Sequence, residues 1–179
     1  MPFAPRVVST EALAHSVVFD VERLELEADG ATFHREVVRH RGAVAVLAVD
    51  VDGLVLVRQW RAPLAAWILE VPAGTCDVEG EDLETTARRE LEEEAGIAAT
   101  SLEWLCDVWN SPGWSDQRTV VFLATGLRRV TPRPSGPEEE SIEVVRMHLE
   151  EAVGLLDAGG TVDATTALAI RTLAARAQR

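Results

Sequence analysis

One stretch, residues 83–95, constrains the fold of this 179-residue chain more than any other. Its apolar residues recur at every fourth position: Leu83, Ala87, Leu91 and Ala95. This spacing predicts a helix with one apolar stripe, which must pack against another element. Gly96 follows at once, as glycine commonly does at the C-terminus of a helix. Short runs typical of strands surround the helix, so we expect the stripe to pack on a sheet.

Eight further runs of the chain are predicted to be strands. The runs with strand-like alternation or continuous apolar character are 17–26, 32–41, 42–50, 54–60, 67–71, 102–109, 119–125 and 142–148. The segment Val51-Asp52-Gly53 joins two of them as a hairpin. Two helices, 149–157 and 165–177, close the chain, with Asp163 as the expected N-cap of the second. This order predicts an α+β fold, an α/β/α sandwich with a mixed sheet.

Composition narrows the class of protein. Hydrophobic residues make up 47% of the chain and charged residues 26%, as in an ordinary globular domain. No apolar run approaches the ~20 residues that span a bilayer, and the N-terminus lacks the pattern of a secretory signal. Cys76 and Cys106 lack the spacing of metal ligands and favour idle thiols over a disulfide. We therefore expect a cytoplasmic protein.

The formal net charge of -13 argues against a nucleic-acid or membrane partner, because both are polyanions that attract basic surfaces. A small phosphorylated ligand remains compatible with this charge if acidic side chains hold a divalent metal. Glu90, Glu93 and Glu94 are candidates, because their i, i+3, i+4 spacing places them on one helix face. Carboxylate oxygens suit Mg²⁺ or Mn²⁺. A solvated acidic face explains the same spacing, and spacing alone does not separate the two.

The stretch from Gly74 to Ile97 resembles the signature of the Nudix hydrolases. That signature is a glycine, five residues, a glutamate, seven residues, then Arg-Glu-aliphatic-x-Glu-Glu-x-Gly-aliphatic. From Glu81 onward the match is complete, through Arg89, Glu90, Leu91, Glu93, Glu94, Gly96 and Ile97. Gly74 is the departure, because six residues rather than five separate it from Glu81. The strand order on both sides is also similar to the family's sandwich.

The resemblance implies hydrolysis of a nucleoside diphosphate linked to another moiety, assisted by Mg²⁺, with Mn²⁺ as an alternative ion. Glu90 and Glu94 would be direct metal ligands together with the backbone carbonyl of Ala73. Glu93 would be a secondary ligand or orienting group. Arg89 and Glu81 would support the glutamates.

Two further segments resemble the ADP-ribose pyrophosphatase subfamily. Pro112, in "SPGWSDQR" from Ser111, lies fifteen positions after Ile97, and "VRQWR" ends at Arg61. The resemblance implies substrate contacts by Arg61, Ser111, Pro112 and Gln117, although many members carry glutamate in place of Gln117. A simple turn at Pro112 and a surface ion pair at Arg61 are the alternatives.

Residues 1–41 are similar in length to the small swapped sheet through which members of this subfamily dimerise. We therefore expect an N-terminal β segment at 1–41, exchanged within a homodimer, ahead of a hydrolase domain at 42–179. Arg35 would then reach the partner's site. Trp114 is a candidate for stacking on adenine, and core or dimer packing is the alternative for the other tryptophans.

The run Glu138, Glu139 and Glu140 stands where the family carries a loop acid. Similarity implies Glu138 as the general base and Glu140 as a metal contact. Glu139 is expected to point away, as neighbours do along an extended loop, and a solvated loop is the alternative for the run.

The expected function is hydrolysis of ADP-ribose to AMP and ribose 5-phosphate. The alternatives are hydrolysis of another nucleoside diphosphate sugar and a non-catalytic ADP-ribose-binding sensor. The intact glutamates at 90, 93 and 94 favour an enzyme.

Overall fold

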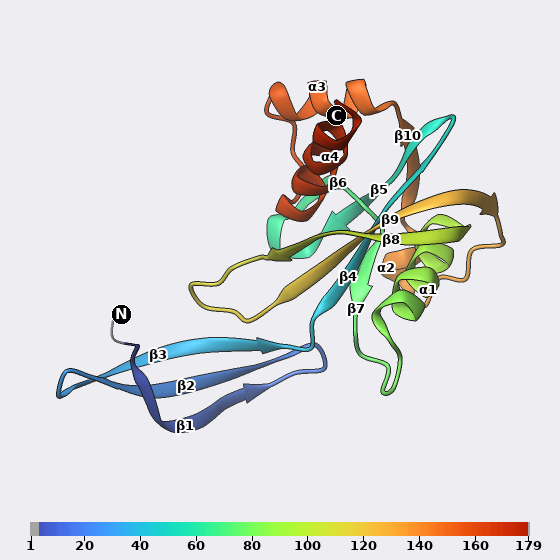
Figure 1. The fold of residues 1–179 in the computed structure, drawn as a ribbon. Coiled ribbons are helices and arrows are strands. Elements are labelled where there is room, and N and C mark those ends of the chain that lie inside the picture. The colour runs from blue at the N-terminus through green and yellow to red at the C-terminus, as the bar shows by residue number, and fades with distance from the viewer. Residues whose placement is uncertain (1–3, 179) are drawn as a thin grey trace. The chain divides into compact units, whose positions relative to one another are not determined.

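The computed structural model describes residues 4–178, which form two compact units (Figure 1). The N-terminal unit holds the chain up to Gly42 together with Trp109–Arg118. The main unit holds Ala43–Val108 and the chain from Thr119 onward. None of the described helices combines the length and the apolar character needed to cross a bilayer.

Three antiparallel strands build the N-terminal unit: β1 (Arg6–His15), β2 (Phe19–Ala28) and β3 (Ala31–His40), in the order β1-β2-β3. Asp29 and Gly30 join β2 to β3 and both have positive φ, 51° and 76°, as a two-residue hairpin turn requires. Strand β1 was not predicted from the sequence. All ten of its residues are exposed, so no alternation of polar and apolar residues marks it as a strand.

The segment 109–118 adds to the edge of β3. Val38 donates its backbone N–H to the carbonyl of Trp114 (2.8 Å), and Asp116 donates to the carbonyl of Val38 (3.2 Å). The Asp116 carboxylate accepts hydrogen bonds from the Arg39 guanidinium (3.1 Å) and the His40 backbone N–H (2.8 Å). This loop is therefore an ordered part of the N-terminal unit.

The main unit is a mixed sheet, as predicted. Its strands are β4 (Ala43–Asp50), β5 (Gly53–Arg61), β6 (Ala66–Glu70), β7 (Ala73–Thr75), β8 (Ile97–Trp109), β9 (Arg118–Arg129) and β10 (Glu143–Met147). The order is β10-β5-β4-β9-β8, with β6 paired to β5 and β7 paired to β4. Strand β4 runs parallel to β9 and antiparallel to β5 and β7.

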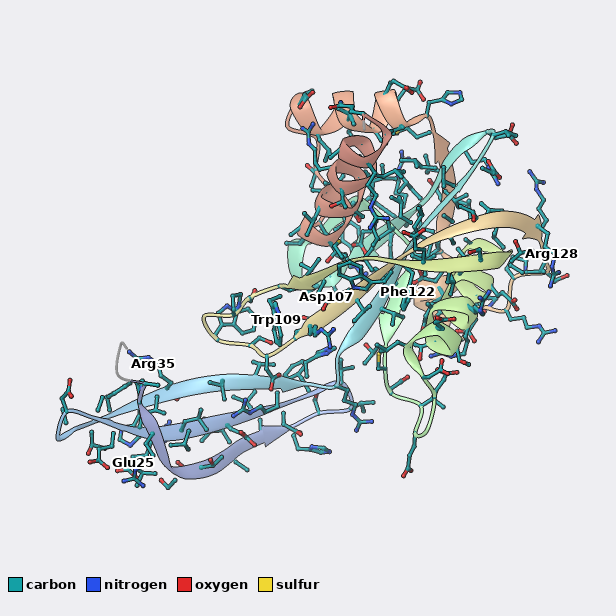
Figure 2. All side chains as sticks on the ribbon, in the orientation of Figure 1. Glu25, Arg35, Asp107, Trp109, Phe122 and Arg128 are labelled. Carbon is teal, nitrogen blue, oxygen red and sulfur yellow. The ribbon has the colours of Figure 1, made fainter. Side chains whose placement is uncertain are left out.

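Helices cover both faces of this sheet, which confirms the predicted α/β/α sandwich (Figure 1). Val44 and Val46 of β4 pack towards α1 (Leu83–Ala95) together with Phe122, which is labelled in Figure 2. Ala45 and Leu47 point to the opposite face, where α3 (Leu149–Asp157) and α4 (Ala164–Ala177) pack. Successive strand residues face opposite sides, so β4 supplies both cores and is buried along six of its eight residues.

Helix α1 has the predicted bounds. Asp82 caps its start by accepting the N–H of Thr85 (2.7 Å), and Gly96 ends it with a φ of 61°. The apolar stripe differs at one position from the prediction, because Leu83 is 39% exposed and Thr86 is buried instead. Asp163 caps α4 as predicted, accepting the N–H groups of Thr165 and Thr166 at 3.0 Å. The two cysteines are free and half-buried.

The expectation of an extended loop at residues 138–140 is wrong. Pro137–Glu140 forms a single helical turn, α2, and Glu140 donates its N–H to the carbonyl of Gly136 (3.1 Å). Proline favours the first position of a helix, and the Glu139 carboxylate accepts the N–H of Ser135 just before the turn (2.6 Å). The three glutamates therefore fan out around a turn and do not alternate.

Candidate active site

A cavity of about 520 Å³ opens in the main unit between β5, the β7 segment, the start of the loop after it, α1 and α2. Its lining residues are Gln59, Arg61, Ala73, Gly74, Thr75, Asp77, Arg89, Glu90, Glu94, Ser135, Gly136, Glu138 and Glu139. Segments separated by up to eighty residues of sequence thus meet around one hollow. Six residues predicted from sequence line it together: Arg61, Ala73, Arg89, Glu90, Glu94 and Glu138.

Two carboxylates of α1 are withdrawn from water at this cavity. The Glu90 side chain is almost fully buried, with the whole residue 6% exposed, and burial raises its pKa to about 7. Burial likewise raises the pKa of Glu94 to about 8, against the opposing hydrogen bond from Ala73. Desolvation disfavours a carboxylate unless a cation compensates it. The acidic helix face is therefore not simply solvated.

Arg89 ties three glutamates together. Its Nη1 donates to Glu90 Oε1 (2.7 Å) and to Glu93 Oε2 (3.0 Å). Its Nη2 donates to Glu81 Oε2 (3.2 Å), which also accepts the hydroxyl of buried Thr86 (2.9 Å). One guanidinium thus orients the side chains of Glu81, Glu90 and Glu93. Because its donors are engaged, Arg89 leaves Glu94 without an arginine partner among the described residues.

The backbone leading to Ala73 is fixed at three successive residues. Val71 donates its N–H to Thr166 Oγ1 (2.9 Å), and the Pro72 carbonyl accepts the N–H of Val46 (2.8 Å). Ala73 then donates its N–H to Glu94 Oε2 (2.9 Å). Thr166 is completely buried in the first turn of α4. The helix at the end of the chain therefore helps to set the position of Ala73.

Gly74 makes room for Glu90. A Cβ at this position would lie 2.0 Å from both Cδ and Oε1 of Glu90, well inside van der Waals contact. The backbone of β7 and the buried carboxylate can approach this closely only without a side chain at residue 74. The glycine in the sequence signature thus has a direct steric reason in this chain.

Arg61 lies at the cavity and pairs with Glu70 in a two-pronged ion pair. Its Nε donates to Glu70 Oε1 (2.7 Å) and its Nη2 to Glu70 Oε2 (2.5 Å). Glu70 is 5% exposed, and its hydrogen bonds raise the pKa of Arg61. Sequence reasoning singled out Arg61 but missed Glu70. The sequence does contain one indication of Glu70: it is the single acidic residue in the otherwise apolar run 66–70, and it ends that run.

The loop acids are placed differently from one another. Glu139 is half-buried, and its carboxylate accepts both the N–H (2.6 Å) and the hydroxyl (2.5 Å) of Ser135. Glu138 and Glu139 line the cavity, whereas Glu140 is not among the lining residues. The negative charge of Glu139 also adds a small upward contribution to the pKa of Glu90 and of Glu94. Sequence reasoning underrated Glu139, because the helical turn could not be foreseen.

The residues present fit a divalent cation that retains water. Within residues 4–178, no three Asp, Glu, His or Cys side chains gather tightly enough to enclose a metal by themselves. Two carboxylates and a backbone carbonyl offer fewer ligands than a closed cage. Mg²⁺ is commonly held in this way, by one or two carboxylates with water and substrate phosphates completing its coordination.

The other predicted substrate contacts belong to the N-terminal unit. The Ser111 carbonyl accepts the N–H groups of Trp114 (3.0 Å) and Ser115 (2.8 Å), so Pro112 lies within a turn. Gln117 is half-buried and donates its backbone N–H to Ser115 Oγ (3.1 Å). The Arg35 guanidinium, labelled in Figure 2, lies 4.9 Å from the centre of the Phe33 ring. Their contacts with substrate stay predictions.

Comparison with known proteins identifies the family. The model of the NUDIX domain matches residues 38–167. An ADP-ribose pyrophosphatase of Bacillus subtilis is 40% identical over 171 residues, which cover 94% of this chain and 91% of that protein. A methanol dehydrogenase activator of Bacillus methanolicus is 36% identical over 174 residues, covering 96% and 93%.

A solved structure extends the likeness to three dimensions. The crystal structure of an ADP compounds hydrolase superposes with a TM-score of 0.84 at 26% identity, over 97% of this chain and 94% of that one. The sandwich, the glutamates around the cavity and the near full-length relatives all agree. This chain therefore belongs to the Nudix family and is a pyrophosphohydrolase.

Proposed function

We propose that the protein hydrolyses the diphosphate of ADP-ribose to AMP and ribose 5-phosphate, with Mg²⁺ and, alternatively, Mn²⁺ as the cofactor. The near full-length likeness to an ADP-ribose pyrophosphatase supports this substrate. The observation that carries the proposal is the placement of Glu90 and Glu94 at one cavity with Ala73, where burial raises the pKa of both carboxyl groups. The two free thiols are consistent with a cytoplasmic location.

Each side chain at the cavity has a proposed task. Glu90, Glu94 and the Ala73 carbonyl would hold the cation, which neutralises phosphate charge and lowers the pKa of attacking water. Arg61 would bind a phosphate of the substrate. Arg89 would keep Glu90 and Glu93 in place through its hydrogen bonds.

The loop acids supply the proton acceptor in this proposal. A general base must lie within hydrogen-bond reach of the attacking water, directly or through one water. We assign this role to Glu138, because it lines the cavity and is exposed. The metal contact predicted for Glu140 stays a prediction.

A substrate panel tests the proposal. The purified protein is assayed with Mg²⁺ against ADP-ribose, a GDP-sugar and NADH, and the products are identified by chromatography. We expect the highest kcat/KM with ADP-ribose, equal amounts of AMP and ribose 5-phosphate, and no activity after chelation of the metal. A preference for another compound, or metal-independent turnover, would contradict it.

A second candidate function is hydrolysis of another nucleoside diphosphate sugar. The solved relative is an ADP compounds hydrolase, and its structure covers 97% of this chain. The same panel separates the two candidates, because both release a nucleoside monophosphate but differ in the sugar phosphate produced.

The loop acids give a testable prediction. Glu138→Gln is expected to lower kcat by about 10²-fold, the lower range for loss of a general base, with little change in KM. Glu139→Gln and Glu140→Gln are measured beside it as the matched changes on the same turn. A larger loss in Glu139→Gln than in Glu138→Gln would move the base to Glu139. Retention of more than half the activity in all three would place the base outside α2.

The N-terminal unit gives a prediction about assembly. Its sheet has a fully exposed β1, and Val7, Val8, Val17 and Phe19 are each at least 43% exposed. A three-stranded sheet with so little buried surface needs a partner for stability. We expect a homodimer in which residues 1–41 are exchanged, measured by light scattering at micromolar concentration. A fully active monomer under these conditions would contradict the exchange.

A further inference from the structure

We propose that Glu70 is a positioning residue that holds the Arg61 guanidinium away from the metal-binding carboxylates and so keeps the metal site open. The inference rests on the proposed function in one respect, the binding of a divalent cation at Glu90 and Glu94. It concerns a residue outside the sequence signature, on β6.

The ion pair between Arg61 and Glu70 fixes the orientation of the Arg61 guanidinium. Both Glu70 oxygens accept hydrogen bonds from Arg61, at 2.7 and 2.5 Å, so the planar guanidinium is held in one orientation. The Arg61 side chain is 39% exposed and lines the cavity, whereas the Glu70 side chain is 7% exposed and is not among the lining residues. Paired forks of this kind fix direction as well as distance. Glu70 therefore determines the position of the positively charged Arg61 guanidinium.

Other carboxylates near Arg61 show where its guanidinium would move if Glu70 were removed. After Glu70, the carboxylates whose charges act most on Arg61 are those of Glu94 and Asp163. Asp163 is engaged, because its two oxygens cap α4 through Thr165 and Thr166. Glu94 lines the same cavity as Arg61 and forms no ion pair with any arginine of the described chain. Glu94 is thus the carboxylate that a released Arg61 would approach.

A released Arg61 guanidinium would therefore compete with a divalent cation for the carboxylate of Glu94. A guanidinium beside Glu94 would pair with this half-buried carboxylate and supply positive charge without any metal. It also repels a divalent cation from Glu90 and Glu94. While Arg61 is paired with Glu70, its charge is already balanced, and the carboxylates of Glu90 and Glu94 stay available to a metal ion.

Manganese binding in the absence of substrate tests the inference. Free Mn²⁺ is titrated against the full-length protein by electron paramagnetic resonance, for wild type, Glu70→Gln, Arg61→Gln and the double variant. Glu70→Gln is expected to bind Mn²⁺ about tenfold more weakly, the usual effect of losing an outer partner of a metal site. Arg61→Gln and the double variant are expected to bind it within about twofold of wild type, because the competing cation is gone.

A matched control separates this effect from a general loss of structure. Asp50 also pairs with an arginine, accepting two hydrogen bonds of 2.9 Å from Nη1 of Arg146, and neither residue lines the cavity. Asp50→Asn therefore removes a carboxylate from a comparable pair elsewhere in the main unit. It is expected to leave Mn²⁺ binding unchanged, while circular dichroism and thermal melting report on folding for every variant.

The outcomes are distinct. Wild-type Mn²⁺ affinity in Glu70→Gln overturns the inference and leaves the proposed function intact. Weak binding in both Glu70→Gln and the double variant also overturns it, because Glu70 would then act without Arg61. If Glu70→Gln does not fold, Glu70→Asp replaces it, with a smaller loss that Arg61→Gln must reverse. A folded wild type that binds no Mn²⁺ overturns the proposed function and the inference together.

Discussion

Replacing Glu94 by glutamine is expected to lower kcat by about 10³-fold while the fold persists, which corresponds to about 4 kcal/mol of transition-state stabilisation. Glutamine has the shape of glutamate, and its carbonyl oxygen can still accept the N–H of Ala73. The negative charge is lost, and with it a direct ligand of the proposed cation. The apolar contacts of Leu91 and Ala95 with the sheet are untouched.

The measurement is steady-state kinetics over a range of Mg²⁺ concentrations, together with thermal melting. Glu92→Gln is the matched control, because Glu92 lies two residues away on α1 and does not line the cavity. It should retain most of the activity. Near-normal turnover in Glu94→Gln at saturating Mg²⁺ would remove Glu94 from the metal site.

Gly74→Ala is expected to lower activity by about 10²-fold or more through a single added methyl group. That methyl would lie 2.0 Å from the Glu90 carboxylate carbon, so the flexible end of Glu90 must move aside. Displacement of a catalytic group by about 1 Å can by itself cost 10²-fold in rate. The clash involves the far end of a side chain and not backbone, and we therefore expect the variant to remain folded.

Gly154→Ala is the control for this change. Gly154 lies inside α3, and a Cβ there meets no atom within 4 Å. Alanine should leave the activity unchanged and raise stability by up to about 1 kcal/mol, since glycine is the poorer helix former. Steady-state kinetics and thermal melting of both variants measure these changes in activity and stability. Equal activity in Gly74→Ala and wild type would show that Glu90 does not need its present position.

Elements with a buried face were predictable from the sequence. The helix 83–95 was found with its bounds, and β4 and β5 were found from continuous apolar runs, because burial selects the residue types. Strand β1 was missed because every one of its residues faces solvent, which leaves no pattern. The turn α2 was missed because four residues carry too short a signal, and a glutamate run is equally compatible with a loop.

Some residues of the cavity were likewise predictable from the sequence, and others were not. Glu90, Glu94 and Arg89 lie close together in sequence and carry a recognisable spacing, so the helix side of the site could be proposed in advance. Glu70 and Thr166 could not, because their partners are nine and ninety-five residues distant and only the folded chain brings them together. Local spacing identifies the groups proposed to bind the metal, and tertiary contacts determine where these groups are held.

The hydrogen bond from Val71 to Thr166 limits how far the signature can act as a transferable module. Val71 and Pro72, which lead into Ala73 at the start of β7, are anchored to α4 and to β4, two elements far apart in the sequence. A segment such as 70–97 grafted onto a foreign sheet would keep every glutamate and lose this anchor. Designers of minimal hydrolases should therefore treat the C-terminal helix as part of the catalytic apparatus, and the shortest functional version of this enzyme as one that still includes it.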